Sequence, residues 1–329
     1  MNIMSPSIAI VRDACFRSVL NVAQLYKVDE SFDHSLFENS SCAFGVFDGV
    51  HRGHRYLLSC AQDTAKETGG QSIALTFDID PDEIFHPDRL RKLLSNKRRL
   101  QMLCDSGVDA VVALPFTRDF ASLSPEDFLR ETFNGHAPAH LHVGLDFHFG
   151  SRASGSVADL GEWGAVVGTH IDAHNLKSTD GAPITATRIR KLLGKHDLDE
   201  AAKLLGRRFT LVEKVRPGRG EGADMGFSTA NLFIKPERRV LGEGVYAAYV
   251  TVDGERYRAA VSMGVSPVFK DETDATCEVH ILDFSKDIYG EYIEVEFVEF
   301  LRPMIKFDST EELIRTVMGN IEYCRKLPL

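Results

Sequence analysis

The sequence has few cysteines and no closely spaced cysteine pair. The six cysteines of the 329-residue chain are scattered, so nothing indicates a zinc site or a disulfide framework. No apolar run approaches the roughly 20 residues needed to span a bilayer. Charged side chains such as Arg12, Arg17 and Lys27 interrupt every apolar run near the N-terminus, where a signal peptide would need one. We therefore expect a cytoplasmic protein with reduced thiols and no membrane partner.

The chain also lacks an excess of positive charge. Lys and Arg number 38 against 48 Asp and Glu, a formal net charge of −10, to which residues 1–194 and 195–329 contribute equally. Proteins that bind nucleic acid independently of its sequence need a basic surface, so we expect no nucleic-acid partner. Neither a Walker A element nor a G-x-G-x-x-G turn is present, and a nucleotide site here must use other residues.

The first half of the chain alternates short apolar runs with amphipathic stretches. Gly69-Gly70 predicts the C-terminal end of one helix, and Ser95 and Ser124 are predicted N-caps of two others. In the short runs, apolar residues follow one another without alternation, as in strands of a parallel sheet that is covered on both faces. These runs are 41–47, 72–77, 110–114 and 141–143. This pattern predicts a doubly wound α/β domain over residues 1–194.

The pattern changes near residue 200. Two short helices are predicted at 185–193 and 197–205, and we place a linker region at 195–206. Beyond it, turn signals separate segments that alternate apolar with polar residues: 246–252, 257–263, 278–284 and 292–300. Residues 207–329 are therefore predicted to form a small antiparallel β-barrel with a C-terminal amphipathic helix at 309–324.

The string Phe47-Asp48-Gly49-Val50-His51-Arg52-Gly53-His54 lies where a predicted strand ends and a helix begins. Ligands of open α/β sheets bind at such junctions, and the free N–H groups of a helix start favour an anion. Phe47, Asp48, Gly49 and Gly53 are therefore candidate phosphate-binding residues. His51 and His54 are three residues apart, so both imidazoles can face the same point on the first helical turn.

Two other interpretations of these histidines stay open. A zinc site would need a third protein ligand, and no His or Cys stands at a suitable spacing. Either histidine alone is more simply explained as a solvated residue at a helix start, whereas the whole string favours phosphate binding.

A second signal is the string Ile184-Thr185-Ala186-Thr187-Arg188-Ile189-Arg190. Hydroxyls at a helix start and two guanidiniums on its first turns suit the charged end of a triphosphate. An N-capped surface helix is the alternative for this segment taken alone. Paired with the histidine string, it favours a nucleotide site.

Together these segments resemble the adenylyltransferase part of the bacterial bifunctional riboflavin kinase/FAD synthetase family. Phe47–His54 is similar to the H-x-G-H signature of nucleotidyltransferases, and segments 76–78, 144–150 and 184–190 follow in the family's order. The resemblance implies that the phosphate of FMN attacks ATP, giving FAD and pyrophosphate. In-line positioning and charge neutralisation do most of the work in such chemistry.

The resemblance also implies roles for individual residues of this part. His51 and His54 would be catalytic, holding ATP phosphates and stabilising charge on the leaving pyrophosphate. Thr187 and Arg190 would hold the outer phosphates. Family members usually have two serines at 185 and 186; the threonine here keeps a hydroxyl, but Ala186 removes one.

In the second half, a glycine-rich loop, Gly218–Gly222, precedes a predicted strand. Backbone N–H groups of such a loop can wrap a phosphate, so Gly218 and Gly222 are candidate phosphate-binding residues. Thr229 and Asn231 point to the same face of a strand, and their oxygens suit Mg²⁺. Glu278 is a candidate base for a substrate hydroxyl, although an exposed strand carboxylate without such a role is commoner.

The order of these segments is similar to that of the riboflavin kinase barrel of the same family. The resemblance implies that Thr229 and Asn231 bind Mg²⁺ and ATP, and that Glu278 activates a riboflavin hydroxyl to attack the γ-phosphate, giving FMN. Further residues implied for the flavin or nucleotide pockets of the two domains are Asp78, Asp146, Phe147 and Arg302.

The second half departs from the family motif at Ala223, Ser228 and Val268, where the family has Arg, Pro and Thr. Without proline, the φ angle before Thr229 is less restricted. A bifunctional enzyme making FMN and then FAD is therefore weighed against an FMN adenylyltransferase with a degenerate barrel, and against a flavin-sensing barrel. In each case we expect small-molecule partners and a monomer or weak homo-oligomer.

Overall fold

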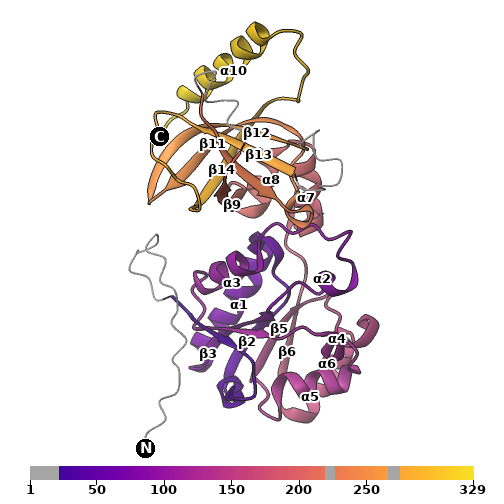
Figure 1. Ribbon diagram of the computed structural model, residues 1–329. Helices are drawn as coiled ribbons and strands as arrows, with labels where there is room; N and C mark the ends of the chain where they lie inside the picture. The colour runs from indigo at the N-terminus through magenta and orange to yellow at the C-terminus, as the bar shows by residue number, and fades with distance from the viewer. Residues whose placement is uncertain (1–21, 219–226, 266–274) are drawn as a thin grey trace, which may run out of the picture.

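The computed structural model describes residues 22–218, 227–265 and 275–329. Figure 1 shows two lobes, an α/β lobe in indigo to magenta and an orange to yellow barrel topped by helix α10 (Thr310–Arg325). The first lobe contains a six-stranded sheet and the second a closed barrel. The predicted fold class, a doubly wound α/β domain followed by a small antiparallel barrel with a C-terminal helix, is confirmed.

The strands of the first lobe are ordered β1-β4-β3-β2-β5-β6, and all neighbouring pairs are parallel. Their bounds are Gln24–Lys27, Ser40–Phe44, Gln71–Phe77, Ala110–Leu114, His140–Gly144 and His170–His174. The chain runs from β2 to one side through β3 and β4, and returns on the other side to β5 and β6. The end of β2 is therefore the switch point at which ligands of such sheets bind.

Helices cover both faces of this sheet. Helices α1 (Arg52–Thr68) and α3 (Asn96–Cys104) pack on one face, whereas α5 (Pro125–Phe133) and α6 (Val157–Val167) pack on the other. Neighbouring strand residues belong to different core clusters, Ile73 to one and Ala74 to the other. Burial on both faces is the reason these strands are apolar on consecutive residues.

The helix ends follow the sequence signals. Ser95 accepts a hydrogen bond from the Arg98 N–H, as an N-cap does, and Ser124 caps α5 in the same way. Helix α1 ends at Thr68, with Gly69 in the left-handed conformation at a φ of 71°. A residue with a Cβ is disfavoured there, so the glycine locates the end of the helix.

The second lobe is a closed antiparallel barrel with the strand order β10-β13-β12-β11-β14-β9. In chain order, the bounds of β9 to β14 are Thr210–Arg216, Ala230–Ile234, Gly244–Val252, Glu255–Val265, Ala275–Ile281 and Tyr292–Arg302. Leu232, Val261 and Val279 lie in the hydrophobic interior. Their neighbours Asn231, Ser262 and Glu278 stand beside one another on the outer face, where the pairing register aligns them.

The structure corrects several details of the sequence prediction. The strand predicted at 278–284 lies at Ala275–Ile281, and its predicted end is a turn. Strands β1, β6 and β9 were not predicted. Two of them, β1 and β6, are short, and β6 also carries two histidines and an aspartate. In the described part of the chain, no helix is long and apolar enough to cross a membrane.

The two lobes share one hydrophobic cluster. Helices α7 (Ala186–Gly194) and α8 (Leu198–Leu205) contribute Leu193 and Leu204 to the barrel core, and Leu93 and Ile184 from the α/β part join the same cluster. The predicted limits of the domains, with a linker at 195–206, stay a prediction. What the packing shows is that the segment between the lobes is itself buried against the barrel.

Candidate functional site

The turn after β2 is held in an unusual backbone conformation. Phe47 has a φ of 59°, Gly49 of 79° and Val50 of 40°. A Cβ on Gly49 would lie 2.6 Å from Leu93 Cδ1, so only glycine fits there. A β-branched residue such as Val50 is rarely found at positive φ, and strain of this kind persists only where the surroundings impose it. The strained turn ends at His51, the N-cap of α1.

His51 and His54 lie against each other at the start of α1. Their ring centroids are 3.5 Å apart, and the His54 N–H donates to His51 Nδ1 at 3.2 Å. A Cβ on Gly53 would lie 3.1 Å from the His51 ring, so glycine leaves room for this arrangement. Among the described residues, the buried His54 Nδ1 has no hydrogen-bond partner. An orphaned nitrogen of this kind favours a site completed by a ligand.

Both imidazoles are neutral at neutral pH. Burial, with a smaller contribution from the Arg207 cation, lowers the pKa of His51 to about 4. Burial and the neighbouring His51 hold the pKa of His54 well below its usual range. The rings therefore offer hydrogen bonds to a ligand rather than fixed positive charge, until an anion raises their pKa values.

A fixed positive charge is supplied by Arg190. Its Nη1 donates to the Asp48 carboxylate at 2.8 Å and its Nη2 to the Thr187 hydroxyl at 3.1 Å. Asp48 is only 8% exposed and also accepts from the N–H groups of Leu93 and Leu94. These contacts orient Arg190, whereas the phosphate contact predicted for Asp48 stays a prediction.

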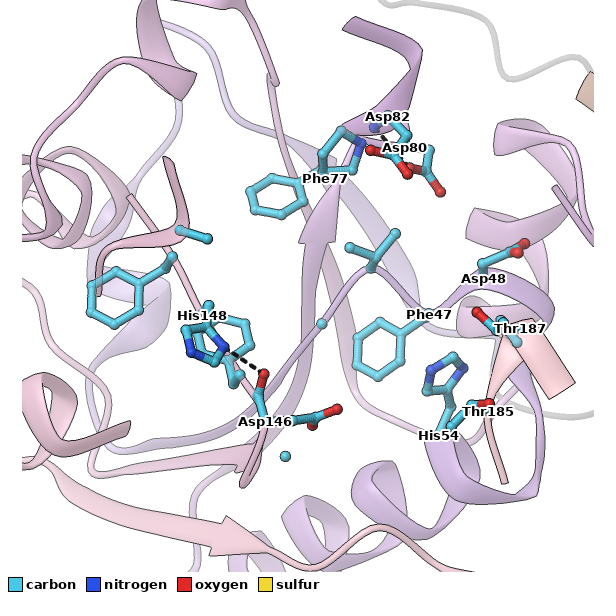
Figure 2. A pocket seen from close by; sticks show the side chains of 18 of the residues that line it. Phe47, Asp48, His54, Phe77, Asp80, Asp82, Asp146, His148, Thr185 and Thr187 are labelled. Carbon is cyan, nitrogen blue, oxygen red and sulfur yellow. Dashed lines mark hydrogen bonds between the residues drawn. The ribbon is translucent and has the colours of Figure 1, made fainter. Parts of the chain in front are cut away.

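These residues face one large cavity of about 1390 Å³. Figure 2 shows Phe47, His54, Thr185 and Thr187 on one side of it, and Asp146 and His148 across from them. Thr185 is the N-cap of α7 and accepts from the Arg188 N–H at 3.1 Å, so its hydroxyl serves the helix start. The structure brings together predicted site residues that are far apart in sequence: Phe47, Asp48, Gly53, His51, His54, Asp146, Phe147, Thr187 and Arg190.

Aromatic side chains form the far wall of the cavity. The rings of Phe44 and Phe128 are stacked, with centroids 6.0 Å apart, and Phe77 and Phe147 pack against Phe44. Such a wall suits a flat conjugated ring. Only Phe147 of this group was predicted, because the other three lie on two strands and a helix whose apolar residues are indistinguishable from core.

Two of the predicted pocket residues differ in their surroundings. Asp146 lines the cavity, whereas Asp78 is not among the lining residues that the structure describes. The Asp78 carboxylate accepts from the N–H groups of Ile79 and Phe116, which ties two strand ends together. The acidic residues that do line this part are Asp80 and Asp82, and the place of Asp78 in the flavin or nucleotide pocket stays a prediction.

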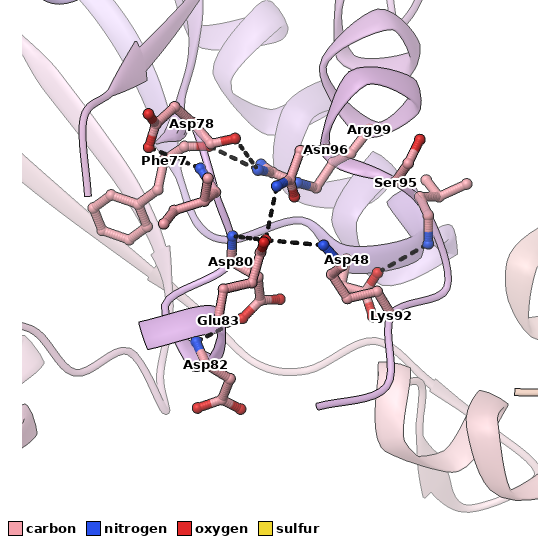
Figure 3. Close-up of polar contacts among 12 residues, drawn as sticks. Asp48, Phe77, Asp78, Asp80, Asp82, Glu83, Lys92, Ser95, Asn96 and Arg99 are labelled. Carbon is pink, nitrogen blue, oxygen red and sulfur yellow. Dashed lines mark hydrogen bonds and ion pairs between the residues drawn. The ribbon is translucent and has the colours of Figure 1, made fainter. Parts of the chain in front are cut away.

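Arg99, a buried arginine beneath the site, was not predicted. It is 2% exposed and donates to the carbonyls of Val46, Phe77 and Asp78 and to the Thr76 hydroxyl. Figure 3 shows it beside a second network, in which Glu83 accepts from Lys92 and Asn96. Arg99 thereby joins the ends of β2 and β3. The one sequence signal for the burial of Arg99 was its position beside the apolar stripe of helix α3.

The predicted residues of the second site gather on the outer face of the barrel. Asn231 and Glu278 are register partners on neighbouring strands, and Glu278 is exposed. A Cβ on Gly218 would lie 2.1 Å from Asn231 Nδ2, so glycine lets the main chain at position 218 approach this amide. Asn231 Nδ2 donates to the Thr229 carbonyl at 3.3 Å, leaving the carboxamide oxygen available for a ligand.

This donor set fits Mg²⁺, which prefers a few protein oxygens and keeps several waters. In the described ranges, no three or more His, Cys, Asp or Glu side chains form a cluster suited to a metal. Thr229 and Asn231 belong to none of these four residue types, so a site that they form would be of a different kind. Arg302 ends β14 and its guanidinium lies 5.7 Å from the Phe307 ring. Gly222, Ala223 and Val268 lie outside the described residues.

Comparison with known proteins agrees with this two-site architecture. Residues 33–188 match the family model described as FAD synthetase, and residues 205–327 match that described as riboflavin kinase. The chain is 34% identical to the bifunctional riboflavin kinase/FMN adenylyltransferase of Pseudomonas fluorescens, over 88% of this chain and 94% of that protein. It is 33% identical to the proteins of the same name from Listeria monocytogenes and Escherichia coli K12, each over 84% of this chain and 88% of the relative.

A solved structure shares the whole architecture. The crystal structure titled macrolide-efflux protein from Streptococcus pneumoniae has a TM-score of 0.79 and 28% identity, covering 92% of this chain and 99% of that one. Both enzymatic domains are thus present in this chain, as the bifunctional interpretation requires. The chain belongs to the bifunctional riboflavin kinase/FMN adenylyltransferase family of transferases.

Proposed function

We propose that this protein makes flavin cofactors in two ATP-dependent steps, phosphorylating riboflavin on the barrel and adenylylating FMN in the α/β cavity. The presence of both domains and the bifunctional relatives support this reading over an adenylyltransferase with an inactive barrel. The observation that carries the adenylylation step is the pair of stacked imidazoles, the buried His51 and the half-buried His54, which faces the same cavity as Thr187 and Arg190.

In the adenylylation step, a phosphate oxygen of FMN attacks the α-phosphorus of ATP. A new P–O bond forms, the bond between the α-phosphorus and its bridging oxygen breaks, and pyrophosphate leaves with the electron pair. Hydrogen bonds from His51 and His54 stabilise the charge that develops on the phosphates. Arg190, oriented by Asp48, neutralises the outer phosphates together with Thr187.

The start of α1 adds a fixed electrostatic contribution, because the helix dipole is positive at that end. The phenylalanine wall opposite suits the flavin ring, with Asp146 and Phe147 beside it. The cavity is large enough to accept both a nucleotide and a flavin, as an in-line displacement between them requires.

In the kinase step, Glu278 accepts the proton of the riboflavin terminal hydroxyl as that oxygen attacks the γ-phosphorus of ATP, and ADP leaves. Thr229 and Asn231 would hold Mg²⁺, which when bound neutralises phosphate charge. Gly218 lets the loop backbone approach the same place. The cytoplasm as the location of this chemistry, and small molecules as the only partners, are further parts of the proposal.

The two activities are expected to separate by mutation. Purified protein is supplied with Mg²⁺, ATP and either riboflavin or FMN, and the products are separated by chromatography. His54→Ala should abolish FAD formation but leave FMN formation, whereas Glu278→Gln should do the reverse. His136→Ala, at a surface ion pair with Glu38, is the matched control and should leave both products. If each variant lowered both activities while the fold stayed intact, the assignment of one reaction to each domain would be wrong.

A further inference from the structure

The carbonyl groups of the strained turn are held from outside the α/β lobe. Arg207 Nη2 donates to the Gly49 carbonyl at 2.8 Å, and Arg207 Nη1 lies 3.4 Å from the Val50 carbonyl. Gly49 and Val50 directly precede His51 and have positive φ angles. The peptide groups whose direction sets the entry to α1 are therefore fixed by a guanidinium 158 residues further along the chain.

Arg207 belongs to the other half of the protein. It follows Gly206, the C-cap of α8, and precedes β9, within residues 205–327 that match the riboflavin kinase model. Its Nη1 also lies 3.4 Å from the Leu205 carbonyl, so the side chain is anchored to its own helix end as well as to the turn. The rigid planar fork of arginine is suited to holding several carbonyls at once.

The surroundings of Arg207 keep this contact in place. Burial and the nearby Arg55 and Arg98 cations lower the pKa of Arg207 to about 10, so the guanidinium still carries its charge at neutral pH. Beside it, Arg98 forms an ion pair of 2.8 Å with Glu294 of β14. The Lys92 N–H donates to the Glu237 carbonyl at 2.6 Å, a further link between the lobes.

The barrel also reaches the cavity itself. Arg239 and Val240, which follow η4 (Pro236–Arg238), are among the residues that line it. Val240 also belongs to the hydrophobic cluster shared by both lobes. The α/β cavity is thus bordered on one side by the barrel, whereas Arg207 contacts the turn without lining the cavity.

We propose that Arg207 is a positioning residue for adenylyl transfer, through which the kinase half of the chain holds the histidine turn of the other half in its active shape. The inference rests on the proposed function of that turn. Without the guanidinium, two carbonyls lose a charged donor and the strained Val50 backbone is free to relax. His51 and His54 would then lose their placement against the phosphates, although Arg207 itself touches no substrate.

The test uses the full-length protein with Arg207→Met, Arg207→Lys and the control Arg208→Met. Arg208 is the neighbouring residue, but its side chain pairs with Glu296 and lies over the Tyr249 ring, both on the barrel. FAD formation from FMN, FMN formation from riboflavin and the melting temperature are measured for each variant. A small misplacement of reacting groups can lower a rate about 100-fold, so for Arg207→Met we expect kcat for FAD formation to fall about 10- to 100-fold.

The pattern across the measurements separates positioning from simple loss of structure. The KM for FMN and the kinase rate should change less than about twofold in Arg207→Met, because the aromatic wall and the barrel face lie apart from the turn. Arg207→Lys keeps the charge but not the fork, and should show an intermediate kcat. Arg208→Met should match the unmodified protein.

Several outcomes would overturn the proposal. FAD formation at the unmodified rate in Arg207→Met is one, and an equal loss in Arg208→Met is another. If Arg207→Met fails to fold, Arg207→Lys decides: a selective loss of FAD formation supports the positioning role, and an unmodified rate refutes it. If the unmodified protein itself makes no FAD from FMN, the proposed function fails instead, which is a distinct result.

Discussion

The Asp48–Arg190 pair gives the sharpest quantitative prediction about the adenylylation site. Asp48→Asn keeps one oxygen for the Leu93 and Leu94 N–H groups, but it replaces the oxygen that accepts from Arg190 with an amide NH₂. The guanidinium then faces a second donor. Because the Asp48 side chain is 10% exposed and that of Arg190 29%, water compensates only in part.

The size of the effect follows from this geometry. Loss of a hydrogen bond to a charged group, with a donor left unsatisfied, costs about 1–3 kcal/mol. For a domain of this size, each kcal/mol lowers the melting temperature by about 2–4 °C. We therefore expect Asp48→Asn to lower the melting temperature by roughly 2–12 °C. It should also raise the KM for ATP in FAD formation, because Arg190 loses its orientation.

A double-mutant cycle tests the reasoning directly. The free energy of unfolding is measured by urea titration for Asp48→Asn, Arg190→Gln and the double variant. We expect a coupling energy of about 1 kcal/mol or more, since the two side chains touch. Asp127→Asn, at an exposed N-terminal helix position, is the control and should leave the KM for ATP unchanged. A coupling energy within about 0.3 kcal/mol of zero would show that Asp48 does not hold Arg190, and would refute the argument.

Three further predictions concern other parts of the molecule. The pKa of His51 is about 4 in the folded protein but about 6.5 in the unfolded chain, so between these pH values the unfolded chain binds more protons. The free energy of unfolding should therefore fall by up to roughly 3 kcal/mol as the pH drops from 6.5 to 4. Urea titrations at each pH measure this dependence, and His51→Gln should flatten it. Arg99→Met leaves several buried acceptors without a donor. FAD formation should therefore be lost, and the free energy of unfolding should fall by about 3 kcal/mol. An unchanged free energy of unfolding would contradict the role of this side chain. Gly218→Ala places a Cβ 2.1 Å from the Asn231 amide. FMN formation from riboflavin should therefore fall about tenfold, with FAD formation from FMN intact. An unchanged kinase rate would mean that the close approach of Gly218 to Asn231 has no part in the kinase step.

The fold was accessible from the sequence because its signals are local. Consecutive apolar residues such as Ile73 and Ala74 reflect burial on both faces of a sheet, and Ser95 and Gly69 mark helix ends through their own backbone hydrogen bonds. Strand β6 was not predictable in this way, because a short edge strand needs little apolar surface. With its histidines, the segment has the polar composition of a loop.

The histidine turn was recognisable for the same reason, since all its residues are neighbours in the chain. The partners that hold it were not. Asp48 and Arg190 are 142 residues apart, and Arg207 reaches Gly49 over 158 residues. Periodicity says nothing about such pairs, so neither the contact of Asp48 with Arg190 nor that of Arg207 with the turn was predictable from the sequence.

The most direct test is a crystal structure of the protein with Mg²⁺ and a non-hydrolysable ATP analogue bound in the α/β lobe. We expect the triphosphate within hydrogen-bonding distance of His51 and His54 at the start of α1, with its outer phosphates against Thr187 and Arg190. A triphosphate bound elsewhere in the cavity, with both imidazoles left without any ligand contact, would contradict it.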